Sequence, residues 1–411
     1  MADHRGVPIY LVGGVVRDLI LKQRTGDLDV TVEGDGIAFA REVADRCRAG
    51  VALFERFGTA RLALPGGIKL DIASTRRESY AQPAALPDVQ PATLLEDLYR
   101  RDFTINAMAV QLNAEEWGRL HDPYGGQRDL KAKRIRVLHE RSFIDDPTRV
   151  FRAVRFATRF TFQLEPATRR LMGQAAATDH VARLSGPRLC NEILLLCCER
   201  EPDRSFDRLA RLKLFRFLHP GLEYSPVARR AVCAVPQAHV WWQRQCGTCP
   251  VDRALMTFVA LLGDAEPFIV RGVTGRLSMS REQVRIVGHA GKPLLSIAEQ
   301  VSAGTQMQPS AVYGLLYGLS DEALLVCLAM QHGRRLRVAR TRIRDFVRTY
   351  RKVAVALRGD ELLRLGVRPG AQVGAMLAAL LAAKLDGVVK GKAGERGFVR
   401  AHLTGAVNSS E

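Results

Sequence analysis

Two aspartates separated by one residue are the first candidates for chemistry in this chain of 411 residues. Asp27 and Asp29 lie in Asp27-Leu28-Asp29-Val30, and alternate residues of a β-strand point to the same face. Carboxylates held this close repel each other unless a cation lies between them. The spacing predicts a site for Mg²⁺, which binds carboxylates and substrate phosphates together. A solvated strand end is the alternative for an isolated Asp-x-Asp.

A third carboxylate would complete the coordination of a two-metal site. Asp71, in Lys69-Leu70-Asp71-Ile72-Ala73-Ser74, is the candidate because a charge in an otherwise apolar strand is costly without a partner. We expect it to act together with Asp27 and Asp29. A structural aspartate near the end of the strand is the alternative.

Two glycines before these acids predict a phosphate-binding turn. Gly13-Gly14 ends an apolar run and is followed by Arg17 and Asp18. Glycines let the backbone approach a phosphate closely, and a following helix offers free N–H groups. Most Gly-Gly pairs are only turns, but this one lies thirteen residues before Asp27.

A segment with two arginines beside an acid is the next candidate: Arg100-Arg101-Asp102-Phe103-Thr104-Ile105-Asn106. Arginine offers fork-shaped donors to phosphate, and aspartate accepts a hydrogen bond from a ribose hydroxyl. A helix cap at Asp102 or Thr104 is the alternative, and both roles are compatible.

A fourth candidate segment combines acids with regularly spaced arginines. Pro147 after Asp146 predicts a helix start, and Arg149, Arg152 and Arg155 recur every three residues on one face. Arginines stacked in this way repel one another, so we expect an anion across them. Asp146 and Arg149 together offer an acceptor and donors that complement a nucleobase edge. A solvated basic helix face is the alternative.

A mixed α/β region and the helices after it must position these side chains. The patterns predict strands at 9–12, 28–33, 54–64 and 68–73, helices at 15–21 and 36–48, a proline-rich loop at 76–93, and a strand or helix at 103–112. Beyond about residue 130 they predict helices at 147–160, 188–199, 205–218, 253–262, 322–330 and 338–357. We therefore expect an α+β protein whose small mixed sheet precedes an extended all-α region.

The charge balance points to a polyanionic partner. Lys and Arg number 61 against 43 Asp and Glu, a net charge of +18, and each phosphate contact would release counterions. A basic surface kept for solubility is the alternative. No apolar run reaches the length of a membrane span and the first residues show no signal segment, so we expect a cytoplasmic protein without membrane contact.

Eight scattered cysteines indicate reduced, buried thiols rather than a disulfide framework. The pair Cys246-Gly-Thr-Cys249 has the spacing of zinc ligands, but no second tight pair accompanies it. A solvent-side turn is the expected structure there.

Taken together, the candidate segments resemble the class II tRNA nucleotidyltransferases and bacterial poly(A) polymerases. The resemblance is carried by Leu11-Val12-Gly13-Gly14-Val15-Val16-Arg17-Asp18, Asp27-Leu28-Asp29-Val30, Arg100 to Ala107, Asp122-Pro123-Tyr124-Gly125-Gly126-Gln127-Arg128-Asp129-Leu130 and Asp145-Asp146-Pro147-Thr148-Arg149. It implies a nucleotidyltransferase catalytic head (1–130), a nucleotide-selecting helical neck (131–200), and an RNA-binding helical body (201–350) and tail (351–411).

The resemblance also implies roles for these residues. Asp27 and Asp29 hold the catalytic metals, and a separate catalytic aspartate is expected at Asp71. The nucleotide-binding set is Gly13, Gly14, Arg17, Asp18, Arg101, Asp102, Asn106, Asp146, Arg149, Arg152 and Arg155. Within it, Gly14 and Arg17 contact the triphosphate, and Asp146 with Arg149 takes the place of a nucleic-acid template. The segment from Asp122 to Leu130 is a hinge between head and neck.

The expected activity is addition of CCA, or of the terminal A, to the 3′ end of tRNA from CTP and ATP. A separate CC-adding enzyme would act first if only A is added. The segment 76–97 resembles that of A-adding members more than that of CCA-adding ones, and Gly186-Pro187-Arg188 departs from the Glu-Arg common in the family. A poly(A) polymerase and a CC-adding specialist remain alternatives, as do a catalytically inactive RNA-binding protein and a small-molecule nucleotidyltransferase. The last class would need neither the charge of +18 nor a long helical body.

Overall fold

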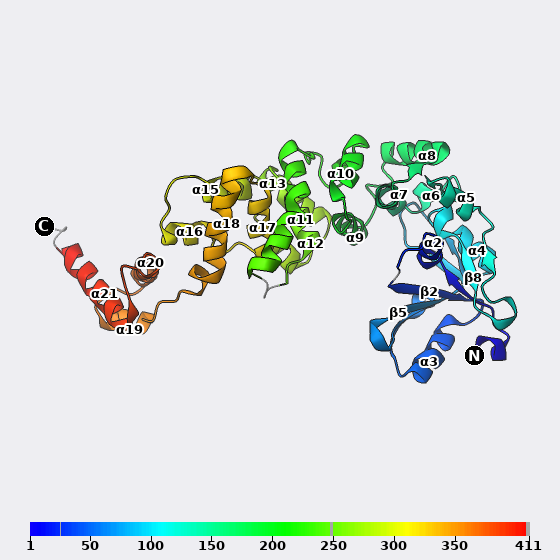
Figure 1. The fold of residues 1–411 in the computed structure, drawn as a ribbon, viewed down its shortest axis with the longest axis horizontal. Coiled ribbons are helices and arrows are strands. Elements are labelled where there is room, and N and C mark those ends of the chain that lie inside the picture. The colour runs from blue at the N-terminus through cyan, green and yellow to red at the C-terminus, as the bar shows by residue number, and fades with distance from the viewer. Residues whose placement is uncertain (25, 247–249, 408–411) are drawn as a thin grey trace. The chain divides into compact units, whose positions relative to one another are not determined.

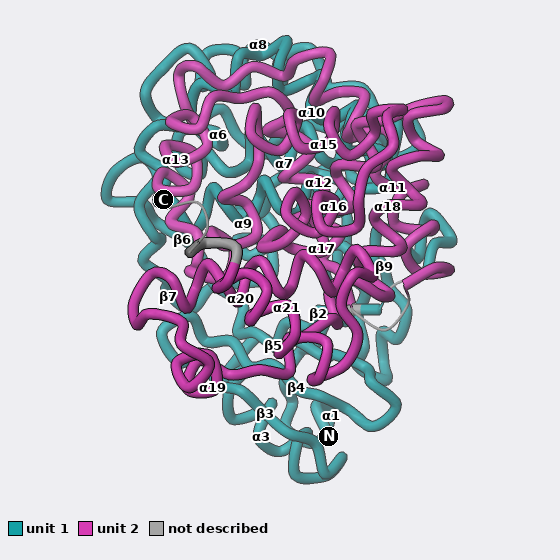
Figure 2. Tube along the Cα trace, turned by 90° about the vertical axis from the view of Figure 1, so that its left-hand side faces the viewer, with its two compact units in different colours: residues 1–217 teal, residues 218–411 magenta. Residues whose placement is uncertain are grey.

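The computed structural model describes residues 1–24, 26–246 and 250–407. The chain divides into two compact units, residues 1–217 and residues 218–411, which Figure 2 colours separately. Unit 1 contains every predicted catalytic and nucleotide-binding residue. The finer division into head, neck, body and tail stays a prediction.

A seven-stranded mixed sheet is the centre of unit 1, with the strand order β3-β4-β5-β2-β1-β8-β9. The strands span β1 (Ile9–Val12), β2 (Asp27–Val32), β3 (Gly50–Phe54), β4 (Thr59–Ala63), β5 (Lys69–Ser74), β8 (Ala109–Gln111) and β9 (Leu120–His121). β2 and β5 run parallel, whereas the other neighbouring pairs are antiparallel. The small mixed sheet predicted from the sequence is confirmed.

Because side chains alternate along each strand, the two faces of this sheet carry different side chains. Helix α3 (Gly36–Cys47) packs on one face, where Val30, Val32 and Ile72 join its Phe39 in a buried cluster. Figure 1 shows α3 on one side of β2 and β5, and α2 (Gly14–Ile20) on the other. Because successive residues of a strand alternate, Asp29 lies on the face away from α3.

The remaining helices and strands of unit 1 lie before, between and after the strands of this sheet in the sequence. They are α1 (Ala2–Arg5), the hairpin β6 (Arg76–Ser79) and β7 (Asp88–Pro91), α4 (Leu94–Tyr99), α5 (Gly126–Lys131), α6 (Ser142–Asp145), α7 (Thr148–Arg159), α8 (Pro166–Ala177), α9 (Gly186–Cys197) and α10 (Pro202–Arg211), with β10 (Arg134–Ile135) and β11 (Gln163–Leu164) as a short parallel pair. Helix α7 is almost entirely buried, so the alternative of a solvated basic helix face is wrong.

Unit 2 is built from helices. They are α11 (Pro226–Cys246), α12 (Arg253–Leu261), α13 (Pro267–Arg276), α14 (Arg281–Val287), α15 (Lys292–Val301), α16 (Pro309–Leu316), α17 (Asp321–Ala329), α18 (Gly333–Arg348), α19 (Gly359–Arg364), α20 (Ala371–Leu385) and α21 (Gly391–Val407). Helices α11, α12 and α17 pack against one another, and every residue of α17 except Asp321 is buried. A separate cluster around Leu362, Leu380 and Val399 joins α19, α20 and α21. Helices thus dominate the chain beyond the sheet, as predicted.

Several predicted elements differ from the structure, and three of them show the physical reason. Prolines 83, 87 and 91 predict a loop at 76–93, but the segment contains the β6–β7 hairpin; its strands are short and lack the apolar alternation that signals a strand. The predicted strand 54–64 begins only at Thr59, because Gly58 turns the chain with φ of 58°. The predicted helix 338–357 spans Gly333–Arg348 and ends where Thr349 leaves helical geometry.

Within the described residues no single helix is both long and apolar enough to cross a membrane; α16 and α17, bent by 108°, would qualify together on length and composition alone.

Burial raises the pKa of the Cys327 thiol to about 12, which is typical of an unreactive structural cysteine. The suggested zinc pair is not tested, because Cys249 lies outside the described residues.

Candidate active site

A cavity of about 670 Å³ in unit 1 brings most of the predicted site residues together. Its lining combines the turn before α2, β2, the segment around Arg101, the β6–β7 hairpin, α7 and α9. The lining residues are Gly13, Gly14, Arg17, Asp29, Glu78, Tyr80, Pro87, Arg100, Arg101, Asp102, Asn106, Asp146, Arg149, Arg152, Arg155, Phe156, Arg159 and Arg188. Eight arginines face four acids in this set, so the cavity suits a polyanion.

The glycine turn between β1 and α2 is required by geometry. Gly13 has φ of 74°, a region that L side chains rarely adopt. A Cβ on Gly13 would lie 2.7 Å from Nη1 of Arg101, so the missing side chain gives that guanidinium its place beside the turn. The strand-then-turn-then-helix arrangement predicted for Gly13 and Gly14 is therefore present.

Arg17 is held from several sides at the first turn of α2. Its Nε donates to Oδ1 of Asp18 at 2.8 Å and its Nη1 donates to Oδ1 of Asn106 at 2.5 Å. The guanidinium also lies over the ring of Phe160, 4.7 Å from its centroid. Burial lowers the pKa of Arg17 in spite of the attraction of Asp18. Asp18 does not line the cavity and instead orients Arg17.

The predicted metal-binding acids lie at the β2–β5 pair. Asp29 lines the cavity and is directly opposite Asp71 in the parallel register. Asp71 is not a lining residue, and both its oxygens accept from Arg61, each at 2.8 Å. Asp27 belongs to β2 and is paired with Lys69, but its side chain lies outside the described part of the structure.

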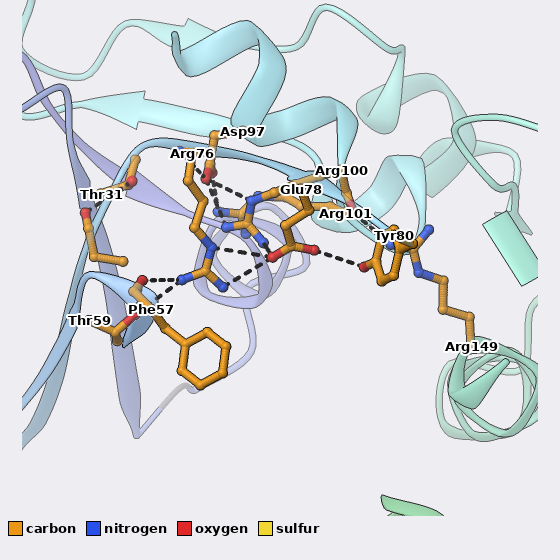
Figure 3. Close-up of polar contacts among 11 residues, drawn as sticks. Thr31, Phe57, Thr59, Arg76, Glu78, Tyr80, Asp97, Arg100, Arg101 and Arg149 are labelled. Carbon is orange, nitrogen blue, oxygen red and sulfur yellow. Dashed lines mark hydrogen bonds and ion pairs between the residues drawn. The ribbon is translucent and has the colours of Figure 1, made fainter. Parts of the chain in front are cut away.

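Arginines surround buried acids in a network of polar contacts (Figure 3). Four residues of this network line the cavity: Glu78, Tyr80, Arg100 and Arg101. Asp97, fully buried, accepts from Arg100 at 2.7 Å and from Arg101 at 2.9 Å. Burial would raise the pKa of Asp97, but the two guanidinium groups outweigh it and lower that pKa. Glu78 accepts from Arg100 at 2.8 Å and from the hydroxyl of Tyr80 at 2.9 Å. These contacts leave Arg100 and Arg101 firmly oriented.

The carboxylates of Asp102 and Glu192 pair with arginines of α7. Asp102 accepts two hydrogen bonds from Arg152, at 2.9 and 2.6 Å, and one from Asn106 at 2.9 Å. Glu192 of α9 lies 3.6 Å from Arg152 and 3.5 Å from Arg155. Burial raises the pKa of Glu192 although both arginines oppose the shift. The anion expected across these arginines is thus partly internal to the protein.

The predicted base-recognition pair, Asp146 and Arg149, lies at the start of α7. Arg149 donates to Oγ of Ser142 and to the carbonyl of Arg100, both at 2.6 Å. Oδ1 of Asp146 accepts from the backbone N–H of Thr148 at 3.0 Å, as the predicted helix start requires. Both side chains line the cavity.

Sequence reasoning missed several lining residues, chiefly Glu78, Tyr80, Arg159 and Arg188. Glu78 and Tyr80 lie in the segment predicted to be a loop, where no apolar alternation marks the strand that positions them. Arg159 follows Arg155 after four residues instead of three, so it falls outside the regular spacing. Its guanidinium donates to Glu199 at 2.6 Å. In the sequence, Arg188 is marked only by the departure of Gly186-Pro187-Arg188 from the Glu-Arg common in the family.

Known proteins match both the sequence and the fold. A family model for the poly A polymerase head domain matches residues 9–136, and one described as a probable RNA and SrmB-binding site of polymerase A matches residues 161–225. An A-adding tRNA nucleotidyltransferase of Geobacter sulfurreducens is 39% identical over 374 residues, 90% of this chain and 42% of that protein. The chain spans only 26% to 53% of the length of three A-adding relatives that it matches.

Two solved structures match almost the whole chain. One is an apo form of a CCA-adding enzyme, 35% identical with a TM-score of 0.80, covering 98% of this chain and 93% of that one. The other is a Thermotoga maritima CCA-adding enzyme complexed with tRNA, 33% identical with a TM-score of 0.73 and the same two coverages. The chain therefore belongs to the family of CCA-adding and A-adding tRNA nucleotidyltransferases, whose head domain is shared with poly A polymerases.

Proposed function

We propose that this chain adds nucleotides to the 3′ end of tRNA without a nucleic-acid template, with the terminal A as its main product. The observation that carries the proposal is the lining of one cavity. A carboxylate for metal, Asp29, arginines for phosphates, and the base-recognition pair Asp146 and Arg149 all face it. A chain that carries its own base-reading pair beside a triphosphate site has no need of a template.

The proposed reaction is an in-line displacement at the α-phosphate of ATP. The 3′ oxygen of the RNA forms the new P–O bond, its proton leaves, and the bond to the β-phosphate breaks to release pyrophosphate. Arg17 and Arg101, which lie beside the Gly13 turn, would hold the departing phosphates. Positioning and charge stabilisation then account for catalysis, and the reaction requires no protein nucleophile.

Divalent metal dependence follows from the family, and we propose Mg²⁺ as the ion. Among the described residues no group of three or more His, Cys, Asp or Glu side chains is placed to hold a metal. Mg²⁺ commonly uses one or two carboxylates plus substrate phosphates, so Asp29 with Asp27 is a fitting donor set. When bound, the ion would lower the pKa of the attacking hydroxyl and neutralise charge on the phosphates. Asp71 would assist from the neighbouring strand.

Base recognition is proposed for the start of α7. Asp146 would accept a hydrogen bond from the exocyclic amino group of the base, and Arg149 would donate to a ring nitrogen or carbonyl. Arg152 and Arg155 would support this pair through Asp102 and Glu192. Two observations favour adenine: the A-adding relatives, and the resemblance of the segment containing Tyr80 to that of A-adding members.

The RNA partner is proposed to be the acceptor arm of tRNA. Exposed Arg334, Arg335 and Arg337 in α18 offer phosphate contacts, which suit recognition of an A-form helix by shape. The tRNA complex of the Thermotoga maritima enzyme supports this substrate class. A separate enzyme that adds CC would supply the substrate.

The test is a gel assay with Mg²⁺, ATP and CTP on three tRNA transcripts, lacking CCA, CA or only the terminal A. We expect extension of the last transcript alone, by one nucleotide. Full extension of all three would establish a CCA-adding enzyme instead. Long A tails on unrelated RNA would show a poly(A) polymerase, and no extension of any transcript would refute the proposal.

A further inference from the structure

One arginine of α9 joins two parts of the cavity wall that are far apart in the sequence. Nη1 of Arg188 donates to the carbonyl of Ala84 at 2.9 Å, and Nη2 donates to Oδ1 of Asp146 at 2.7 Å. Ala84 belongs to the connection between β6 and β7, here called the hairpin connection (residues 80–87). The same guanidinium therefore holds the hairpin connection and the proposed base-reading carboxylate.

We propose that Arg188 is a specificity-determining positioning residue that makes the base subsite accept adenine rather than cytosine. This inference rests on the proposed function. Arg188 would act without touching the nucleotide. Its effect passes through Asp146, whose orientation it holds, and through the hairpin connection, whose distance from α7 it limits.

The contacts of Asp146 leave one oxygen for the substrate. Oδ1 accepts three hydrogen bonds: from Arg188, from the backbone N–H of Thr148 at 3.0 Å, and from Oγ1 of Thr148 at 2.6 Å. Among the described residues no donor is bonded to Oδ2. Three bonds on one oxygen prevent rotation of the carboxylate, so Oδ2 presents a single acceptor in a fixed direction.

A single acceptor cannot by itself distinguish the two bases. Adenine and cytosine both carry an exocyclic amino group that would donate to Oδ2 of Asp146. Adenine is larger than cytosine, so the width of the subsite can distinguish the two bases. Tyr80 and Pro87 of the hairpin connection line the same cavity, so their position would set that width.

The backbone of the hairpin connection is strained at the point that Arg188 holds. Ala84 has φ of 66°, a left-handed conformation that is unfavourable for a non-glycine residue. The hydrogen bond from Arg188 to the Ala84 carbonyl offsets that cost. Without it, Ala84 would relax toward ordinary backbone geometry and Tyr80 and Pro87 would shift with it.

The test uses tRNA ending in CC and compares kcat and KM for ATP and for CTP in the whole protein. For Arg188→Ala we expect the ratio of kcat/KM for ATP to that for CTP to fall about 10- to 100-fold, the range that separates substrates by size in a pocket. The KM for ATP should rise more than kcat falls. tRNA binding should stay unchanged.

Arg188→Lys keeps the charge but not the planar fork that reaches two acceptors. We expect an intermediate ratio, and this variant carries the test if Arg188→Ala does not fold. Arg183→Ala is the matched control, since it removes an exposed arginine five residues earlier that touches neither Asp146 nor Ala84. Its ratio should equal that of the unaltered chain.

The outcomes separate this inference from the proposed function. If the unaltered chain extends no tRNA, the proposed function fails. If it does extend tRNA, while folded Arg188 variants lose activity equally for ATP and CTP or keep the original ratio, Arg188 has only a structural role and the inference is overturned.

Discussion

Arg152 donates two hydrogen bonds to a single oxygen of Asp102, from Nε at 2.9 Å and from Nη2 at 2.6 Å. The two residues are fifty positions apart and connect α7 to the segment that follows α4. Asp102 is only 7% exposed, so its charge depends on this partner. Burial lowers the pKa of Arg152, whereas the charges of Asp102 and Glu192 raise it. The effect of the two acids is the larger one, so the pKa of Arg152 is raised.

Asp102→Asn should lower the free energy of unfolding by about 2–3 kcal/mol, because it leaves the buried Arg152 with only the more distant Glu192 as a counter-charge. This loss of stability is smaller than that expected for a fully buried pair because 32% of the Arg152 side chain is exposed. Urea unfolding at neutral pH measures it. Asp360→Asn, which removes an exposed pair with Arg364, is the control and should cost less than about 1 kcal/mol.

The loss of stability in Asp102→Asn should also depend on pH. Burial alone would raise the pKa of Asp102, but Arg152 and Asn106 outweigh it and lower that pKa below its ordinary value. A carboxylate with a lowered folded-state pKa contributes stability above its unfolded pKa of ~3.9 and loses that contribution as the pH falls through the folded pKa. The stability difference between the unaltered chain and Asp102→Asn should be constant from pH 7 to 5 and shrink below about pH 4. A difference independent of pH down to pH 2 would contradict it.

Asp29→Asn should lower kcat at least about 10³-fold, because metal stabilisation of the phosphates is worth several kcal/mol and each 1.36 kcal/mol is tenfold in rate. tRNA affinity should change little. Asp27→Asn is expected to behave in the same way. Single-turnover incorporation and a filter-binding assay measure the two quantities, and substantial turnover by the double variant would exclude this metal site.

Asp71→Asn and Arg61→Ala distinguish a catalytic from a structural Asp71. Both variants break the same ion pair. The side chain of Asp71 is 29% exposed and that of Arg61 is 60% exposed, so the pair should contribute less than about 1 kcal/mol to folding. We expect only Asp71→Asn to lower kcat, since Asp71 lies opposite Asp29 in the sheet. Equal, small effects of the two variants on activity would show that Asp71 serves only Arg61.

Arg149→Ala should relax base choice more than it weakens triphosphate binding. Its guanidinium is oriented by Ser142 and the carbonyl of Arg100, and no hydrogen bond of the described residues joins it to the glycine turn. Incorporation of each of the four nucleotides onto tRNA ending in CC, at equal concentrations, measures the preference. Arg17→Ala is the comparison, and it should raise the KM of every nucleotide alike. Unchanged preferences in Arg149→Ala would argue against the base-reading pair.

Much of unit 1 was predictable because its signals are local. β1 spans the predicted residues 9–12, and α3 and α7 begin within one residue of their predicted starts, since apolar periodicity and the Asp146-Pro147 signal act over a few residues. The β6–β7 hairpin was missed for the converse reason. Its strands pair only with each other and bury few apolar side chains, so the sequence contains no alternation to detect.

The sequence by itself determined the family, the order of sheet and helices, and most residues that line the cavity, because these depend on residue type at short spacing. Only the tertiary structure decided which charges neutralise one another. Arg152 pairs with Asp102, Arg61 with Asp71, and Arg188 bridges Ala84 and Asp146. Such pairs join distant segments, and a hydrogen bond needs its two atoms within about 3 Å, a distance that packing sets and local sequence does not.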